Sequence, residues 1–439
     1  MRIALLLILS VLPLLAQDPN QRQELDLKGQ PVHRWKIAIP DFKLTEGAEE
    51  YREAWQTINE VVRDDLANSG FFEVLSQQRI GLIRNPHDGP ILFSDWQSIE
   101  AVHLAVGRVF GKDGQLRVEI RLFEIATKQS ILAKAVTGKP SLARKIAHTI
   151  SDYILTHLHN SHFASSKILF TKRRRSTVGT SNLDELFIMD YDGHNHMAIT
   201  RGGIVFSPNA KRLGKDIMLV YGAYQNAFSV NATYTLQFKP SLRSKPRPLF
   251  KKPGQRAMAP SFSPDGRKVA FALADNGNTD VWVMNLDGSD ALRLTRHNGI
   301  DTNATWSPGG SSLLFTSDRT GTPQIYRMDA DGLNRVLITT ENPYNDSAVW
   351  NPRHDLMVYV SRFENNFDIF VMNLQTRESY RVTKSQGSNE EPHWSPDGEQ
   401  ICFTSNRSGS WQIYAINRNG TNLRQITTTG VNREPVWID

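Results

Sequence analysis

The chain has 439 residues, of which 39% are hydrophobic and 22% are charged, and its net charge is +6. So small a positive surplus disfavours a nucleic-acid-binding protein, which would gather Lys and Arg on one face. The single cysteine, Cys402, excludes an intramolecular disulfide, so packing alone must hold the fold together. Cys402 lies in an apolar strand pattern, where we expect a buried structural thiol.

The first residues have the order of an export signal. Arg2 precedes an apolar run over residues 3–15, and the small Ala16 is followed by polar residues, which is typical of a secretory signal peptide. The run is shorter than the roughly 20 apolar residues that cross a bilayer, and a buried N-terminal helix is the alternative interpretation. We therefore predict a signal peptide at 1–16, a flexible polar segment at 17–33 and a soluble periplasmic protein.

Residues 34–162 mix strand and helix patterns, which predicts a small α/β domain. Residues 35–39 alternate like a strand. Two stretches carry apolar residues at helical spacing, one from Trp55 to Leu66 and one from Leu142 to Leu158, and the second is opened by Pro140. His157, His159 and His162 cluster near the end of the second helix. Their spacing favours an interaction with the helix dipole over metal ligation.

The remainder, residues 163–439, is a repeat. Phe262, Trp306, Trp350 and Trp394 follow one another at intervals of 44 residues, and each precedes a turn-forming motif of the Ser-Pro-Asp-Gly type. Each unit then holds short apolar strands, Asp-Gly or Asn-Gly turns, and a final strand that ends in threonine. A unit of four strands with this period is typical of a β-propeller blade.

Counting the units predicts six blades. Two further units begin at Phe206 and Trp437, and the last has no strands after it, whereas residues 167–200 lack an opening strand. The two fragments complete each other, so the C-terminal strand should close the ring. The unit that begins at Phe206 is longer, and we assign its extra residues to an insertion around 221–248. The basic run 172–175 is interpreted as an exposed loop between strands.

No pattern for enzyme chemistry emerges. The chain lacks a Gly-x-Ser-x-Gly elbow, a phosphate loop and a His-Glu-x-x-His motif. The Ser-Pro-Asp-Gly carboxylates recur around the ring as turn formers and do not converge on one site. The alternative is a propeller-type periplasmic hydrolase or lactonase, whose metal ligands would have to meet in the axial channel.

Polar, variable segments precede each opening strand, and symmetry gathers them at one end of the propeller. We interpret them as loops, and a rigid scaffold that presents variable loops is typical of a binding surface. Ordinary solvated loops are an equally good interpretation. The carboxylates in these segments could also hold a Ca²⁺ ion in the channel; otherwise we expect no cofactor.

The sequence resembles the TolB family of the periplasmic Tol–Pal system. The resemblance rests on the signal peptide, on residues 37–42 (Ile-Ala-Ile-Pro-Asp-Phe) and 190–193 (Asp-Tyr-Asp-Gly), on the repeated hairpins and on residues 434–437 (Glu-Pro-Val-Trp). It implies a protein that is not an enzyme. Its propeller would bind Pal, the peptidoglycan-associated lipoprotein, and its N-terminal segment would engage TolA, in support of outer-membrane integrity and cell division.

The resemblance also implies partner-binding residues. Family contact positions match Arg256, Ala259 and Thr302, although Arg256 stands where well-known members carry histidine. Asp346 belongs to the corresponding segment of the next unit. We therefore expect these four residues to form the partner site.

Overall fold

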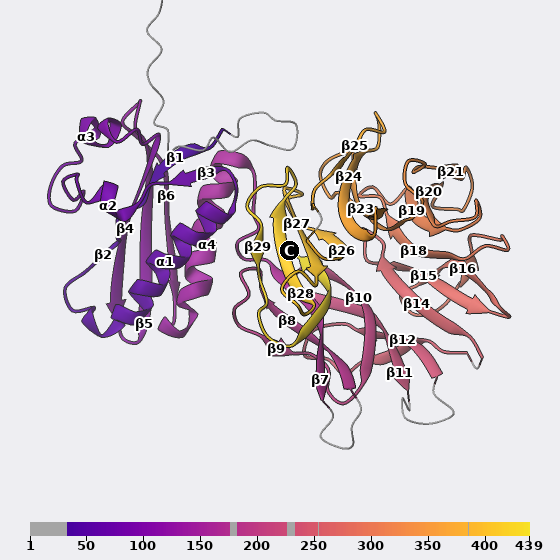
Figure 1. Cartoon of the computed structure of the whole chain (residues 1–439). Coiled ribbons are helices and arrows are strands. Elements are labelled where there is room, and N and C mark those ends of the chain that lie inside the picture. The colour runs from indigo at the N-terminus through magenta and orange to yellow at the C-terminus, as the bar shows by residue number, and fades with distance from the viewer. Residues whose placement is uncertain (1–32, 176–181, 226–232, 253, 385) are drawn as a thin grey trace, which may run out of the picture.

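The computed structural model describes residues 33–175, 182–225, 233–252, 254–384 and 386–439. Figure 1 shows an α/β domain beside a β-propeller. The predicted fold class is therefore confirmed, whereas the predicted signal peptide and nearly all of the predicted flexible segment lie outside the described residues. Within the described ranges, no helix has both the length and the apolar composition that crossing a membrane requires.

The α/β domain is built on one sheet with the strand order β3-β1-β4-β5-β6. Its strands are β1 (Trp35–Ala38), β2 (Lys43–Leu44, paired with β4), β3 (Phe72–Val74), β4 (His103–Lys112), β5 (Gln115–Glu124) and β6 (Gln129–Gly138). Its helices are α1 (Arg52–Asn68), α2 (Gln77–Ile80), α3 (Phe93–Ser98) and α4 (Ala143–His159), with 3₁₀ turns at Glu49–Tyr51 and Pro140–Leu142.

Helices α1 and α4 are the two that the apolar spacing predicts. They pack against each other, and their buried stripes share one core with the sheet. That core continues into the propeller, where it includes Tyr191, Cys402 and Trp437. The thiol of Cys402 is fully buried, and burial raises its pKa above the usual range, as expected for a structural cysteine.

Six four-stranded antiparallel sheets form the propeller in the described part of the chain. The blades are blade 1, β30 (Val431–Ile438), β7 (Lys167–Arg175), β8 (Asn182–Asp190) and β9 (Met197–Ala198); blade 2, β10 (Ile204–Leu213), β11 (Asp216–Gln225), β12 (Thr233–Lys239) and β13 (Arg247–Phe250); blade 3, β14 (Arg256–Phe262), β15 (Lys268–Asp275), β16 (Asn278–Asn285) and β17 (Leu292–Arg293); blade 4, β18 (Asp301–Trp306), β19 (Ser312–Ser317), β20 (Gln324–Asp329) and β21 (Val336–Leu337); blade 5, β22 (Asn345–Trp350), β23 (Leu356–Phe363), β24 (Asn366–Asn373) and β25 (Ser379–Arg381); and blade 6, β26 (Asn389–Trp394), β27 (Gln400–Ser405), β28 (Gln412–Asn417) and β29 (Arg424–Gln425).

The threonine that ends each unit has a structural role, which blade 6 illustrates. The backbone N–H of Ile413 donates to Thr427 Oγ1 at 2.9 Å, and the Thr427 hydroxyl donates to Gln412 Oε1 at 2.7 Å. Asn432 of the next blade donates to the same oxygen at 2.8 Å. Blades 4 and 5 repeat this arrangement, so a buried hydrogen-bond chain joins each of these blades to its neighbour.

One expectation about local structure is wrong. The basic run 172–175 lies at the end of strand β7 and not in a loop, although its three arginines are exposed as expected. Part of the extra length of blade 2 lies in the hairpin of β11 and β12, which spans residues 216–239, against residues 312–329 for the corresponding hairpin of blade 4. Residues 226–232 between β11 and β12 are not described.

The ring closes as predicted, because the C-terminal strand β30 pairs with β7 and completes blade 1. All four residues of the pairs Val436–Leu169 and Trp437–Ile168 are buried. Trp437 Nε1 also donates to Ser166 Oγ at 2.7 Å. Closure leaves no unpaired edge at this seam.

Deletion of residues 435–439 should therefore destabilise the whole propeller. We expect a loss of more than about 3 kcal/mol in urea unfolding, because several buried side chains and a strand pairing are removed together. Met197→Ala is the matched control, since this exposed residue of β9 belongs to the same blade, and it should change stability by less than about 0.5 kcal/mol. Equal stability of the deletion variant and the full chain would contradict the closure.

Candidate functional site

The first strand of every blade contains a β-bulge. The register of each first strand against its neighbour shifts at this point. A non-glycine residue with positive φ lies at each shift: Ser207 (46°), Ala259 (48°), Asn303 (51°), Ser347 (56°), Glu391 (57°) and Glu434 (53°). We call these six residues the channel ring, because first strands of adjacent blades contact one another all around the axis.

The channel ring lies toward the end where each blade connects to the next, which we call the loop end. The segments that we predicted as loops are in fact parts of these first strands, and this is a correction to the sequence interpretation. A bulge inserts an extra residue and interrupts strand alternation, so its polar, irregular sequence looks like a loop. Left-handed backbone at non-glycine residues is often associated with functional positions.

The four predicted site residues lie on three neighbouring first strands at this end. Ala259 is a member of the channel ring on β14, whereas Thr302 and Asp346 directly precede the ring residues of β18 and β22. Asp346 Oδ1 accepts hydrogen bonds from Asn303 at 2.8 Å and from Thr316 at 2.7 Å. Asn303 follows Thr302 in the chain and donates to Asp346, so Thr302 and Asp346 lie close together in the structure.

Arg256 lies apart from that group. It begins β14 and is exposed, and its guanidinium carbon is 4.9 Å from the centre of the Tyr234 ring on β12. This cation–π contact directs the side chain toward blade 2. A similar contact occurs between blades 6 and 1, where the guanidinium carbon of Arg433 lies 4.5 Å from the centre of the Trp411 ring. Arginine and aromatic side chains therefore meet at two of the junctions between neighbouring blades.

A pair of carboxylates, Glu391 and Glu434, was not singled out by sequence reasoning. The backbone N–H of Glu434 donates to Glu391 Oε2 at 2.7 Å, and that of Ser207 donates to Glu434 Oε1 at 3.1 Å. Arg433 donates to Glu390 at 3.0 Å and to Glu391 at 2.9 Å. Burial and the adjacent Glu391 carboxylate raise the pKa of Glu434 to about 8. The repeat position of the bulge is the signal that could have identified the pair.

These carboxylates line a small hollow of about 190 Å³ between blades 6, 1 and 2. Each has hydrogen-bond partners from the chain itself, so the geometry does not call for a Ca²⁺ ion there. Among the described residues, the one group of three side chains that could share a metal ion is His148, Asp190 and Asp192. It lies where the two domains meet and not in the channel.

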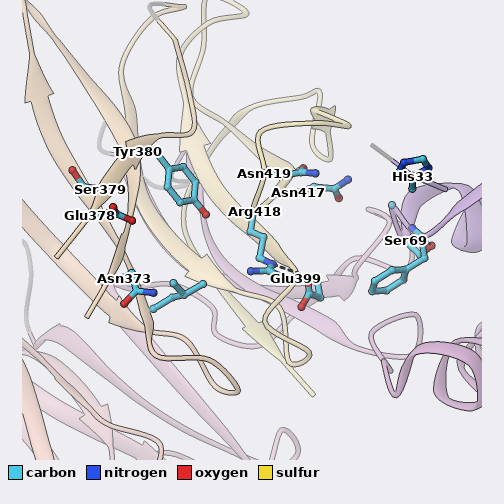
Figure 2. A pocket seen from close by; sticks show the side chains of 13 residues that line it. His33, Ser69, Asn373, Glu378, Ser379, Tyr380, Glu399, Asn417, Arg418 and Asn419 are labelled. Carbon is cyan, nitrogen blue, oxygen red and sulfur yellow. Dashed lines mark hydrogen bonds and ion pairs between the residues drawn. The ribbon is translucent and has the colours of Figure 1, made fainter. Parts of the chain in front are cut away.

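Figure 2 shows a larger cleft, of about 880 Å³, between the α/β domain and the outer parts of blades 5 and 6. His33 and Ser69 lie on its α/β side, and Tyr380 and Arg418 lie on its propeller side. Arg418 is held by Glu399, to which its Nε donates at 2.7 Å. The first described residue, His33, therefore lies beside the propeller.

Two family profiles match the chain. The profile described as TolB beta propeller domain matches residues 156–369 and 360–439, and the profile described as TolB amino-terminal domain matches residues 23–131. A Tol-Pal system protein TolB from Anaeromyxobacter dehalogenans (strain 2CP-C) is 33% identical over 253 residues, which are 56% of this chain and 54% of that protein. The protein of the same description from strain 2CP-1 is 32% identical over the same shares. The chain thus spans about half the length of the curated relatives it matches.

A solved structure has the same fold. The crystal structure of TolB from Acinetobacter baumannii superposes with a TM-score of 0.78, at 24% sequence identity, over 93% of this chain and 97% of that one. At this identity the similarity concerns the fold alone. It extends across both domains, which agrees with the two profile matches.

Titration of Glu434 should be visible in stability. Because its pKa in the fold exceeds the ordinary value of 4.5, its stabilising contribution is complete below about pH 4.5 and is lost as the pH rises toward 8. Glu434→Gln keeps the oxygen that accepts from Ser207 but carries no charge. The free energy of unfolding of the variant, relative to that of the unmodified protein, should therefore rise by at least about 1 kcal/mol between pH 5 and pH 8. One pKa unit corresponds to about 1.4 kcal/mol.

Denaturant titrations at the two pH values would measure this difference. Glu364→Gln is the control, because Glu364 is exposed in a hairpin of blade 5, and its difference from the unmodified protein should not change with pH. If the difference in stability between Glu434→Gln and the unmodified protein also stays constant, the inference that this carboxylate pair holds a proton is wrong.

Proposed function

We propose that this chain, which belongs to the TolB family, is the protein-binding component of a Tol–Pal envelope system. It would act in the periplasm, where the loop end of its propeller binds a Pal-type peptidoglycan-associated lipoprotein. In this role it would support outer-membrane integrity and cell division. The channel ring is the observation that carries the proposal, because it holds the backbone of the loop end in a fixed position on a closed scaffold.

Preorganisation supports a binding role for this end. The backbone at each ring position is held by strand pairing on both sides of the bulge, so little order has to be gained on binding. The composition supports it too. Arg256 is exposed, and Tyr234, Arg433 and Trp411 are partly exposed. Arginine and aromatic residues of this kind dominate binding energy in protein interfaces.

The competing function, a hydrolase or lactonase, finds less support. Such an enzyme needs metal ligands or catalytic groups that converge on an open point in the channel. The channel carboxylates Asp346, Glu391 and Glu434 instead accept hydrogen bonds from neighbouring backbone and side-chain groups. Their contacts stabilise the ring.

A second partner is proposed from family membership alone. We propose that the segment 17–33 engages a TolA-type inner-membrane protein. Only His33 of this segment is described, and it lines the cleft between the domains. The segment therefore joins the folded protein beside the propeller and not at its loop end.

The partner site is tested by Ala259→Arg. Ala259 is small and lies in the channel ring, so a bulky side chain there should block a close approach by steric clash. We expect calorimetric titration with the soluble domain of a Pal-type lipoprotein to show binding weakened tenfold or more, which corresponds to about 1.4 kcal/mol. The melting temperature should remain near that of the unmodified protein.

Ser311→Arg is the matched control. Ser311 is exposed in the hairpin between β18 and β19, at the opposite end of the propeller, and this variant should bind as the unmodified protein does. If Ala259→Arg and Ser311→Arg bind the Pal-type domain with equal affinity, the partner site does not lie at the channel ring.

A further inference from the structure

A buried cluster of ionisable side chains joins the two domains. His148 of α4 is at its centre, with a side chain that is 4% exposed. Its Nδ1 lies 3.0 and 3.1 Å from the two carboxylate oxygens of Asp65 on α1. Its Nε2 has no hydrogen-bond partner and lies 3.5 Å from Asp192 Oδ2, in the turn after strand β8 of the propeller. The imidazole therefore lies between Asp65 of the α/β domain and Asp192 of the propeller.

The other charged groups of the cluster are also paired, one pair across the junction and one within the propeller. Arg144, one turn before His148 on α4, donates to Asp192, and Lys167 of β7 pairs with Asp190. Asp65 contacts neither of these cations: besides His148, the Tyr191 hydroxyl donates to it at 2.7 Å. Further charged groups nearby are Asp152, one turn after His148 on α4, and Asp64, beside Asp65 on α1. Arg424 of β29 lies with its guanidinium carbon 5.8 Å from the centre of the Tyr191 ring, and His194 pairs with Asp192.

Asp65 is 1% exposed, and a buried carboxylate without a cation carries a large desolvation cost. A protonated His148 supplies that cation: its Nδ1 donates to Asp65, and its Nε2 lies 3.5 Å from Asp192 Oδ2, within ion-pair distance. Burial alone would lower the pKa of His148, but the hydrogen bond and charge of Asp65, with the charges of Asp192 and Asp190, hold it above the ordinary value of 6.5.

We propose that His148 is a proton-operated latch between the domains: its protonated ring donates to Asp65 within the α/β domain and attracts Asp192 of the propeller. Loss of the proton removes the attraction between His148 and Asp192, while the Arg144–Asp192 ion pair, the hydrogen bond from Tyr191 to Asp65 and the apolar contacts of the shared core remain. The latch is closed below about pH 6.5 and weakens as the pH rises through the raised pKa of His148. The two domains thus separate more readily in alkaline than in neutral conditions.

A metal ion is the alternative occupant of this cluster, since His148, Asp190 and Asp192 offer three ligand atoms within 4.8 Å of one another. The carboxylates are already engaged by cations, however, and Asp190 also accepts from Asn195 Nδ2 at 2.6 Å. A metal ion would have to displace Lys167 and Arg144. The proton therefore fits the geometry better than a divalent cation does.

Hydrogen exchange of the full chain tests the latch. Protection of residues 187–196 and of α4 is measured from pH 6 to pH 9 and corrected for the intrinsic exchange rate, with strands β19 and β20 of the distant blade 4 as the internal reference. In the unmodified protein, protection at the junction should fall tenfold or more over this range. In His148→Gln it should be low throughout and independent of pH, while protection of blade 4 stays unchanged.

His157→Gln is the matched control, because His157 lies on the same helix as His148 and is exposed. This variant should keep the pH dependence of the unmodified protein. The latch would be overturned if protection at the junction of the unmodified protein did not change with pH. It would also be overturned if protection in His148→Gln fell with pH as it does in the unmodified protein. Protection that depends on EDTA or is restored by Zn²⁺ at pH 9 would overturn it as well, since a metal ion would then hold the junction.

Discussion

The pairing of strand β30 with β7 is the constraint on which the rest of the structure depends. It joins the C-terminal end of the described chain to the strand that directly follows the α/β domain, so one seam closes the propeller and anchors its neighbour. Trp437 of this strand belongs to the apolar core that α1 and α4 share, and it stacks with Tyr191 at a centroid distance of 6.4 Å. The same buried contacts therefore close the ring and hold the α/β domain against it.

A closed ring also explains how six left-handed backbone positions persist. A non-glycine residue at positive φ costs of order 1 kcal/mol, and it survives only where surrounding contacts determine it. Here each bulge is held between paired strand segments. In blades 5, 6 and 1 the bulge also follows closely after Asn345, Asn389 and Asn432, at which the buried hydrogen-bond chain ends. The same rigidity that tolerates the strain fixes the positions of the loop-end side chains before any partner arrives.

The repeat made the architecture predictable from sequence, because a regular interval of 44 residues between aromatic positions reports blade spacing directly. The bulges were not predictable, since an extra residue breaks alternation in the same way that a loop does. The segments that hold Arg256, Ala259, Thr302 and Asp346 were therefore interpreted as loops, although they are parts of first strands. The Glu391–Glu434 pair and the Asp65–His148–Asp192 cluster escaped notice for a different reason: their members are distant in sequence, or come together only through a bulge, and no local pattern marks them.

The junction combines two kinds of contact that do different work. The shared apolar core keeps the domains together over a wide range of conditions, because hydrophobic contact depends little on direction or pH. The ionic cluster contributes direction, since Asp65, His148 and Asp192 meet at hydrogen-bond or near hydrogen-bond distances only when α1, α4 and the turn after β8 are aligned. A proton on His148 therefore acts on the alignment of the domains more than on their folding. A protein built around a rigid ring can in this way vary the placement of its second domain while its partner-binding end stays fixed.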